Sequence, residues 1–185
     1  MAGRFIAVVG PSGVGKDSVM SALATSEPRL SLVRRTITRA ADAGGEDYEA
    51  ASEETFRERV ADGQFSLHWQ AHGLSYGIPI SVEDRLARGE DVLANLSRSA
   101  LRTMADRFER WDILALTAQP DVLHTRLLSR GRETPADIDR RLVRAGNTIP
   151  SGLEAKELDN SGALEETVRT ALALLYPASA KRLIS

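Results

Sequence analysis

The residues best suited to chemistry form a glycine-rich run with one lysine near the start of the chain. Glycines at positions 10 and 15 let the backbone turn tightly around an anion, successive N–H groups of such a loop point inward, and a following helix adds the partial positive charge of its N-terminus. Lys16 would reach the terminal phosphates of a nucleoside triphosphate. The run is therefore a candidate P-loop, and each of its residues is a candidate cofactor ligand: Gly10, Pro11, Ser12, Gly13, Val14, Gly15, Lys16, Asp17 and Ser18.

One position of this loop departs from the common pattern. The Ser or Thr expected after the lysine is Asp17, and Ser18 follows one place later. In many P-loop enzymes a neighbouring strand ends in a metal-associated acid, whereas the apolar run 92–96 contains none. We therefore expect Asp17, together with Ser18, to support Mg²⁺ directly or through water. The alternative is that Asp17 only stabilises the helix N-terminus through the helix dipole.

Arginine supplies 21 of the 24 cationic residues. Genomic composition bias is one source of such a ratio, but a guanidinium also binds phosphate with two parallel hydrogen bonds and keeps its charge. Phosphoryl transfer depends on in-line positioning and on positive charge around the transferred oxygens. We therefore predict an arginine-rich lid over residues 130–146, with Arg130 and Arg141 acting beside Lys16 as catalytic residues, and Arg132 and Arg144 in reserve.

The elements that must position these residues follow from the hydrophobic pattern. The predicted strands cover residues 4–9, 30–38, 91–96, 111–117 and 156–159, and residues 65–79 are predicted to form a small antiparallel hairpin. The predicted helices cover residues 16–25, 52–63, 81–89, 97–107, 120–129, 134–146 and 164–175, with serines at positions 52 and 81 as N-terminal caps. Alternating strands and helices indicate an α/β protein with a P-loop kinase fold, in which helices flank a parallel central sheet and ligands bind at the strand C-termini.

Length and composition narrow the function classes. A chain of 185 residues that is 42% hydrophobic predicts one domain, residues 1–185, without room for a further motor or regulatory domain. The chain has no cysteine, which excludes disulfides, thiolate metal sites and a cysteine nucleophile. A net charge of -2 argues against a nucleic-acid partner, and the lack of a signal peptide or an 18-residue apolar run favours a cytoplasmic protein without a membrane partner. A small phosphotransferase fits these limits.

Four stretches extend this interpretation. They are GPSGVGK at 10–16, RTITR at 35–39 with GEDY at 45–48, the hairpin at 69–77, and RGRET at 130–134 followed by RL at 141–142. In this order they resemble the guanylate kinases. The resemblance implies an acceptor-binding subdomain over about residues 34–82 and makes Arg35, Arg39, Tyr48 and Tyr76 ligands of the acceptor's phosphate. The alternative for the two tyrosines is a core aromatic ring with a hydrogen-bonded hydroxyl.

At the positions where guanylate kinases recognise guanine, this chain has different residues. Guanylate kinases have a carboxylate before the hairpin tryptophan, a hydroxyl after the hairpin Tyr-Gly, and an acid on the following strand. Here these places hold His68, Ile78 and the acid-free run 94–96. A site built to hydrogen-bond a base discriminates poorly once such groups are replaced, so GMP is not the expected acceptor.

A further combination points to one branch of the family: GKDS at 15–18, TR at 38–39 followed by DAGGE at 42–46, and WQAHG at 69–73 followed by YGIP at 76–79. It resembles the ribose 1,5-bisphosphate phosphokinases of phosphonate degradation. The resemblance implies transfer of the γ-phosphate of ATP, with Mg²⁺, to the 1-phosphate of ribose 1,5-bisphosphate, giving 5-phosphoribosyl 1-diphosphate and ADP. A phosphate acceptor is already a dianion near neutral pH, so it needs no general base.

Several questions stay open on the sequence. A guanylate kinase or another small-molecule phosphate kinase is the alternative enzyme, and a binding module that has lost catalysis is the alternative outside enzymes. The sequence leaves monomer and homodimer open. His68 and His72 either bind the sugar phosphate or are structural residues of the hairpin. Asn160 is an adenine contact by family position or a turn residue.

Overall fold

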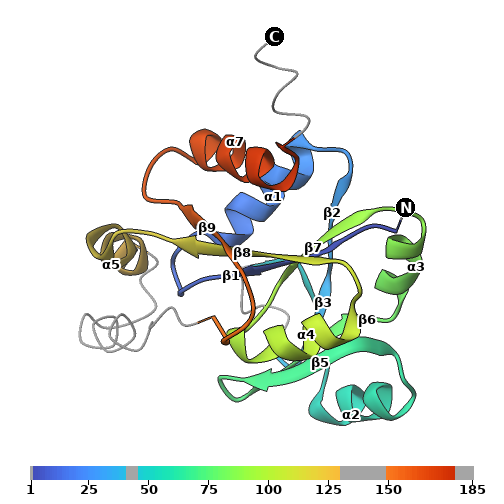
Figure 1. Ribbon diagram of the computed structural model, residues 1–185. Coiled ribbons are helices and arrows are strands. Elements are labelled where there is room, and N and C mark those ends of the chain that lie inside the picture. Colours follow the sequence, from blue (N-terminus) through green and yellow to red (C-terminus); the bar gives the residue numbers. More distant parts are fainter. Residues whose placement is uncertain (1, 41–45, 130–148, 178–185) are drawn as a thin grey trace. The chain divides into compact units, whose positions relative to one another are not determined.

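The computed structural model describes residues 2–40, 46–129 and 149–177 (Figure 1). The chain divides into two compact units. Unit 1 consists of Met1–Ala7 and Pro28–Asp112, and unit 2 consists of Val8–Glu27 and Ile113–Ser185. The predicted lid, the predicted helix over 134–146 and residues 130, 132, 141 and 144 lie outside the described residues. A single domain and the 34–82 subdomain boundaries stay predictions.

The central sheet confirms the predicted fold class. Its strand order is β2-β7-β1-β8-β9, with β1 at Phe5–Val9, β2 at Leu30–Leu32, β7 at Asp91–Asn95, β8 at Trp111–Thr117 and β9 at Lys156–Asp159. The pairs β2–β7 and β8–β9 are parallel. All five residues of β1 are buried, as expected of a strand covered on both faces. The structure is thus α/β, with helices flanking a parallel central sheet.

Unit 1 also contains a second sheet with the order β4-β3-β6-β5. Its strands are β3 at Arg35–Ile37, β4 at Tyr48–Ala50, β5 at Phe65–Ala71 and β6 at Leu74–Pro79. β3 and β4 are parallel, whereas β3–β6 and β5–β6 are antiparallel. The predicted hairpin is therefore confirmed.

The prediction of one strand over residues 30–38 was wrong, because this stretch contributes β2 to one sheet and β3 to the other. The N–H of Val33 still bonds to the carbonyl of Leu93, 2.9 Å away, on β7. Two residues later Arg35 is paired with Tyr48 of β4. The chain thus changes partners between two short strands without a glycine or proline to mark the change.

The helices of unit 1 are α2 at Glu53–Ala61, α3 at Ser81–Ala87 and α4 at Leu101–Arg107, preceded by a 3₁₀ turn, η1, at Arg98–Ala100. The predicted cap of α2 is confirmed, because Ser52 Oγ accepts a hydrogen bond of 3.0 Å from the N–H of Thr55. The predicted cap of α3 was wrong. Ile80 occupies the cap position with helical dihedral angles, so Ser81 is already the first residue of the helix and makes no side-chain cap bond.

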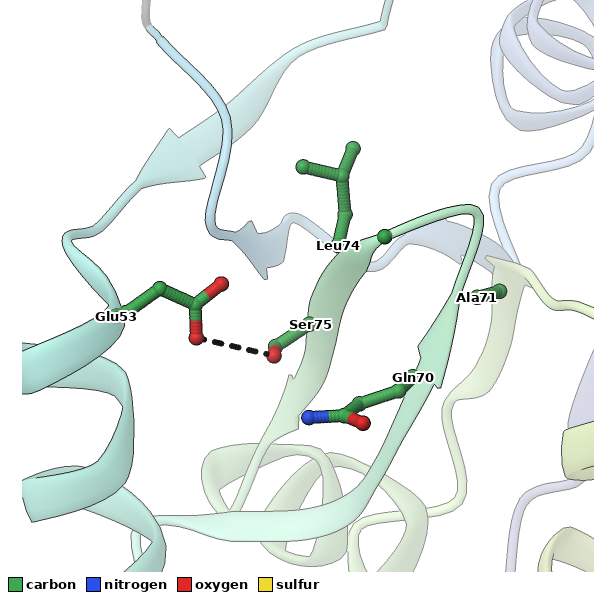
Figure 2. A pocket seen from close by; sticks show the side chains of 6 residues that line it. Glu53, Gln70, Ala71, Leu74 and Ser75 are labelled. Atoms are coloured by element: carbon green, nitrogen blue, oxygen red, sulfur yellow. Dashed lines mark hydrogen bonds between the residues drawn. The ribbon is translucent and has the colours of Figure 1, made fainter.

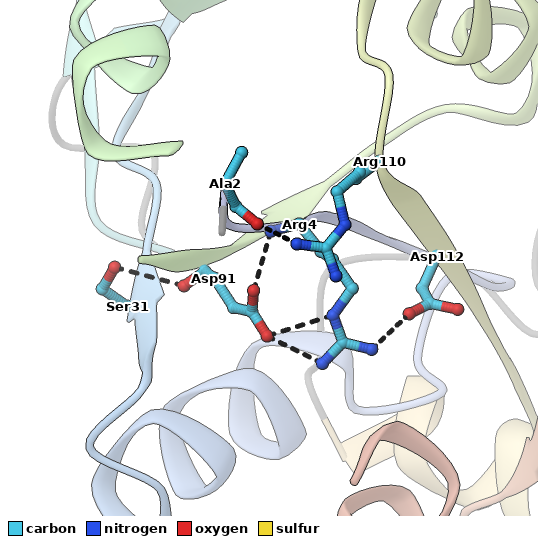
Figure 3. A network of polar contacts seen from close by, with 6 residues as sticks. All are labelled: Ala2, Arg4, Ser31, Asp91, Arg110 and Asp112. Carbon is cyan, nitrogen blue, oxygen red and sulfur yellow. Dashed lines mark hydrogen bonds and ion pairs between the residues drawn. The ribbon is translucent and has the colours of Figure 1, made fainter. Parts of the chain in front are cut away.

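Unit 1 is held together at the start of its strands by an ionic network around Arg4, drawn in Figure 3. The guanidinium donates to Asp91 Oδ2 at 2.7 and 3.2 Å and to Asp112 Oδ2 at 2.8 Å, and the N–H of Arg4 donates to Asp91 Oδ1 at 2.7 Å. Arg4, Asp91 and Asp112 have side-chain exposures of 19%, 11% and 13%. The Arg4 guanidinium therefore pairs with one carboxylate on β7 and one near the beginning of β8, and all three side chains are largely buried.

Unit 2 contains α1 at Lys16–Ser26, α5 at Pro120–Ser129 and α7 at Leu164–Leu175. Helix α7 packs beside α1, and its buried face includes Val168, Ala171 and Leu175 (Figure 1). Among the helices that the structure describes, none is long and apolar enough to cross a membrane.

Candidate phosphate-transfer site

The glycine-rich loop of unit 2 joins β1 to α1 and forms a close-fitting cradle. Gly13 and Gly15 have positive φ angles of 83° and 92°, which a residue with a side chain rarely adopts. A Cβ atom on Gly13 would lie 2.9 Å from Leu127, and one on Gly15 would lie 2.7 Å from Asn160 Nδ2. Only glycine permits both the turn and these close approaches, as the prediction of a phosphate-binding loop requires.

Lys16 begins α1 directly after this cradle. Its Nζ donates to the carbonyls of Gly10 at 2.9 Å and Pro11 at 3.2 Å, so the ammonium lies at the loop. Val14 and Gly13 are buried, whereas Pro11 and Ser12 are partly exposed. The structure thus gathers the predicted triphosphate ligands on one loop.

The two predicted magnesium residues, Asp17 and Ser18, are exposed on the first turn of α1. Within the described ranges, no group of three or more histidine or acidic side chains could hold a metal ion. The part of Asp17 and Ser18 in holding Mg²⁺ stays a prediction.

Asn160 lies beside the loop. Its side chain is 4% exposed, Nδ2 donates to the carbonyl of Val14 at 2.7 Å, and Oδ1 accepts from Thr167 Oγ1 at 2.9 Å. Its side-chain amide is thus used inside unit 2. The adenine contact that family position predicts for Asn160 stays a prediction, and nothing in the sequence indicates this contact with Val14.

The predicted acceptor ligands lie on the second sheet of unit 1. Arg35 on β3 is 4% exposed. Its Nε donates to Glu46 Oε2 at 3.2 Å, its Nη2 donates to Glu46 Oε1, and its Nη1 donates to the carbonyl of Asn95 at 2.7 Å. Described residues therefore use three of its five N–H groups, and they leave two N–H groups for another acceptor.

Two aromatic rings cover the same guanidinium. Trp69 and Tyr76 stack with ring centroids 5.3 Å apart, and the Arg35 guanidinium lies 5.0 Å from the Tyr76 centroid and 5.9 Å from the Trp69 centroid. Trp69 Nε1 donates to Ser97 Oγ at 2.9 Å. The two rings of the hairpin thus pack against the face of the Arg35 guanidinium, while the Glu46 carboxylate accepts hydrogen bonds from its N–H groups.

Arg39 and Tyr48 form a second arginine–tyrosine pair. The guanidinium carbon lies 4.3 Å from the ring centroid, and the Tyr48 hydroxyl donates to the carbonyl of Ala40. Tyr48 is 8% exposed, which agrees with its alternative interpretation as a core aromatic with a bonded hydroxyl. Arg39 is partly exposed. Of the two arginines, Arg39 is the more accessible to an acceptor phosphate.

The guanine-reading positions offer little to a base. Ile78 is fully buried and pairs with Leu67, Ala94 is fully buried, and His68 is exposed on β5. His72 has a φ of 53° and precedes Gly73 with a φ of 74°, the two positive angles that a tight two-residue hairpin loop requires. The backbone of His72 is therefore part of the turn, and the role of its side chain stays open between binding the sugar phosphate and a structural one.

A separate polar pocket of about 280 Å³ lies at the hairpin tip (Figure 2). Glu53 reaches across it and accepts a hydrogen bond of 3.4 Å from Ser75 Oγ. Gln70 is the cross-strand partner of Ser75. Successive side chains of a strand point to opposite faces of the sheet, so these two point away from the face that carries their chain neighbours Trp69 and Tyr76. The Gln70 and Ser75 side chains at the pocket therefore lie on the other face of the hairpin from Trp69 and Tyr76.

Comparisons with known proteins agree with this arrangement. The family model described as guanylate kinase matches residues 2–170. The ribose 1,5-bisphosphate phosphokinase PhnN of Ruegeria sp. (strain TM1040) is 50% identical over 174 residues, covering 94% of this chain and 92% of that protein. The protein of the same name from Agrobacterium fabrum is 43% identical over 173 residues, covering 92% and 94%.

The solved guanylate kinase from Anaplasma phagocytophilum superposes with a TM-score of 0.69 at 19% identity, covering 96% of this chain and 86% of that one. At that identity the likeness shows a shared fold. The family model and the sequence relatives, in contrast, align over most of the chain and include the loop and both arginine–tyrosine pairs within their range. The chain therefore belongs to the guanylate kinase family and, within it, to the ribose 1,5-bisphosphate phosphokinases of the PhnN type.

Proposed function

We propose that this protein transfers the γ-phosphate of ATP to the 1-phosphate of ribose 1,5-bisphosphate, giving 5-phosphoribosyl 1-diphosphate and ADP in phosphonate degradation. The observation that carries the proposal is the contrast within unit 1. The arginine–tyrosine pairs that are predicted to bind the acceptor's phosphate are present, whereas the positions predicted to read guanine hold His68, the fully buried Ile78 and the acid-free run 94–96. The near full-length similarity to PhnN proteins supports the same substrate.

On the donor side, the loop over residues 10–18 holds the triphosphate of ATP through its N–H groups, and Lys16 neutralises the terminal phosphates. Mg²⁺, when bound with ATP, supplies charge neutralisation on the β- and γ-phosphates, and Asp17 and Ser18 are the residues of this chain that would support it. Arg130 and Arg141 are proposed to stabilise the charge of the transferred group.

On the acceptor side, the nucleophile is a phosphate oxygen that is already ionised near neutral pH, so no side chain has to remove a proton. We infer that Arg39 binds this phosphate directly while Tyr48 packs against its guanidinium. Arg35 offers its two remaining N–H groups and keeps Tyr76 in place. Both substrates are small soluble metabolites, which is consistent with a cytoplasmic enzyme that needs neither nucleic acid nor a membrane.

The test is a substrate panel with purified protein, ATP and Mg²⁺. We expect formation of 5-phosphoribosyl 1-diphosphate with ribose 1,5-bisphosphate, no comparable turnover with GMP, and loss of turnover in Lys16→Met at unchanged melting temperature. Rapid turnover of GMP with none of ribose 1,5-bisphosphate would overturn the proposal in favour of a guanylate kinase. A folded protein that binds no ATP in calorimetry would indicate a binding module instead.

A further inference from the structure

The carbonyl of Val14, in the middle of the glycine-rich loop, receives two hydrogen bonds from distant parts of unit 2. Asn160 Nδ2 donates to it at 2.7 Å and Arg126 Nη1 donates to it at 3.3 Å. Val14 itself is fully buried. A buried carbonyl needs a donor, and this one has two from elements more than a hundred residues further along the chain.

The direction of that carbonyl decides where the next N–H points. In a trans peptide the C=O of Val14 and the N–H of Gly15 lie in one plane and point in opposite directions. Holding the carbonyl toward Asn160 therefore turns the Gly15 N–H to the opposite side of the loop. A P-loop needs its N–H groups on the side of the phosphates and its carbonyls turned away from them.

Asn160 is itself fixed in orientation. Its N–H donates to the carbonyl of Thr117 at 2.8 Å, directly after the paired ends of β8 and β9. Its Oδ1 accepts from Thr167 Oγ1 on α7 at 2.9 Å, and Thr167 is 3% exposed. The Thr167 hydroxyl thus selects the amide rotamer that presents the NH₂ group to Val14.

Gly15 completes the arrangement. Its φ is 92°, and a Cβ at this position would lie 2.7 Å from Asn160 Nδ2. The glycine that bends the loop is therefore also the residue that allows the asparagine amide to come close. The two positions fit each other, although they are far apart in the sequence.

We propose that Asn160 is a positioning residue for the nucleotide phosphates: its amide, oriented by Thr167, fixes the Val14–Gly15 peptide so that the N–H of Gly15 faces the triphosphate. This inference rests on the proposed binding of ATP at the loop. It also assigns Asn160 a role other than contact with adenine, because the side chain acts through the loop backbone.

The test is the affinity of Asn160 variants for ATP and for inorganic tripolyphosphate, measured by calorimetry with Mg²⁺. Asn160→Asp replaces the donor by an oxygen that repels the Val14 carbonyl. We expect it to weaken binding of both probes by about 10-fold, because the buried Val14 carbonyl loses its shorter hydrogen bond and keeps only the one from Arg126 at 3.3 Å. Thr167→Val should weaken both by about 3- to 10-fold, and Thr167→Ser, which keeps the hydroxyl, should restore binding.

Thr170→Val is the matched control, because Thr170 lies on the exposed face of α7 and, within the part of the chain that the structure describes, its hydroxyl bonds only to the Glu166 carbonyl of its own helix. It should bind both probes as the unmodified protein does. Melting temperatures separate loss of binding from loss of folding, and Thr167→Val remains informative if Asn160→Asp does not fold.

Weaker binding of ATP with unchanged binding of tripolyphosphate would overturn the inference, because it would make Asn160 an adenine contact. Unchanged binding of both probes by a folded Asn160→Asp or Thr167→Val variant would overturn it as well. Neither outcome depends on the acceptor. A failure of ribose 1,5-bisphosphate as substrate, in contrast, would count against the proposed function while leaving the positioning role intact.

Discussion

Replacing Arg35 by methionine separates two roles that this residue could have in unit 1. Methionine keeps the apolar stem against Trp69 and Tyr76 but removes the guanidinium. Glu46, whose side chain is 18% exposed, would lose both of its hydrogen bonds to Arg35, and the carbonyl of Asn95 would lose a donor at 2.7 Å. The substitution therefore leaves a largely buried carboxylate and a carbonyl without the cation that pairs them.

The size of the effect follows from that burial. Removing one partner of a buried ion pair destabilises a protein by about 3–5 kcal/mol, and the partial exposure of Glu46 favours the lower end. We expect Arg35→Met to lower the free energy of unfolding by about 3 kcal/mol. For a chain of this length, that corresponds to a melting temperature lower by about 9 °C.

The assay is urea unfolding followed by circular dichroism, applied to Arg35→Met, Glu46→Gln and the double variant. Because the two side chains share one interaction, the double variant should lose less stability than the sum of the single variants, by about 1–3 kcal/mol. The Michaelis constant for ribose 1,5-bisphosphate, measured well below the melting temperature, reports any direct contact of Arg35 with the acceptor.

An unchanged unfolding midpoint in Arg35→Met would refute the reasoning that the Glu46 pair stabilises unit 1. If that result came with a raised Michaelis constant, Arg35 would be a substrate ligand alone. Additive losses in the double variant would show that Arg35 and Glu46 stabilise unit 1 independently.

Three other substitutions test separate features. Arg4→Met should lower the free energy of unfolding by about 3–5 kcal/mol without changing either Michaelis constant, because it removes the cation that two largely buried carboxylates share (Figure 3). A wild-type urea midpoint would contradict this. The hydrogen bond from Arg59 holds the pKa of Glu49 at about 2, below its ordinary 4.5. Stability from this pair is therefore fully present above about pH 4.5 and is lost as the pH falls toward 2, and Glu49→Gln should remove that part of the pH dependence in acid unfolding curves. Asp17→Ser should raise the Mg²⁺ concentration for half-maximal turnover about tenfold; an unchanged Mg²⁺ titration would leave Asp17 as a helix N-terminal acid.

Much of the fold could be predicted from the hydrophobic pattern and the turn residues of the sequence. The bounds of β8, α5 and β9 agree with the predicted ranges. For β8 and α5 the reason is an apolar segment flanked by turn residues. The hairpin was predictable for the same reason. The division between β2 and β3 was not, because both halves carry strand-like residues and the change of partner depends on β7 and β4 rather than on any residue between them.

The candidate site was predictable as a set of residues but not as a set of contacts. Glycine and lysine spacing located the loop, since a P-loop is built from consecutive residues. The pairing of Arg35 with Glu46 and of Val14 with Asn160 joins residues 11 and 146 positions apart. Such contacts depend on which strands become neighbours, and hydrophobic periodicity carries no information about that choice.

The lost guanine contacts are not simply polar groups removed from an otherwise intact pocket. Ile78 is fully buried and pairs with Leu67, which is 3% exposed, so this position has become part of the hydrophobic core of unit 1. A hydroxyl introduced there would be desolvated at a cost of about 1–3 kcal/mol unless the backbone offered it a partner. His68 on the same hairpin is exposed and differs from a carboxylate in charge. Recognition of guanine would therefore require repacking of the sheet as well as new polar groups, so a single substitution at Ile78 is not expected to introduce it.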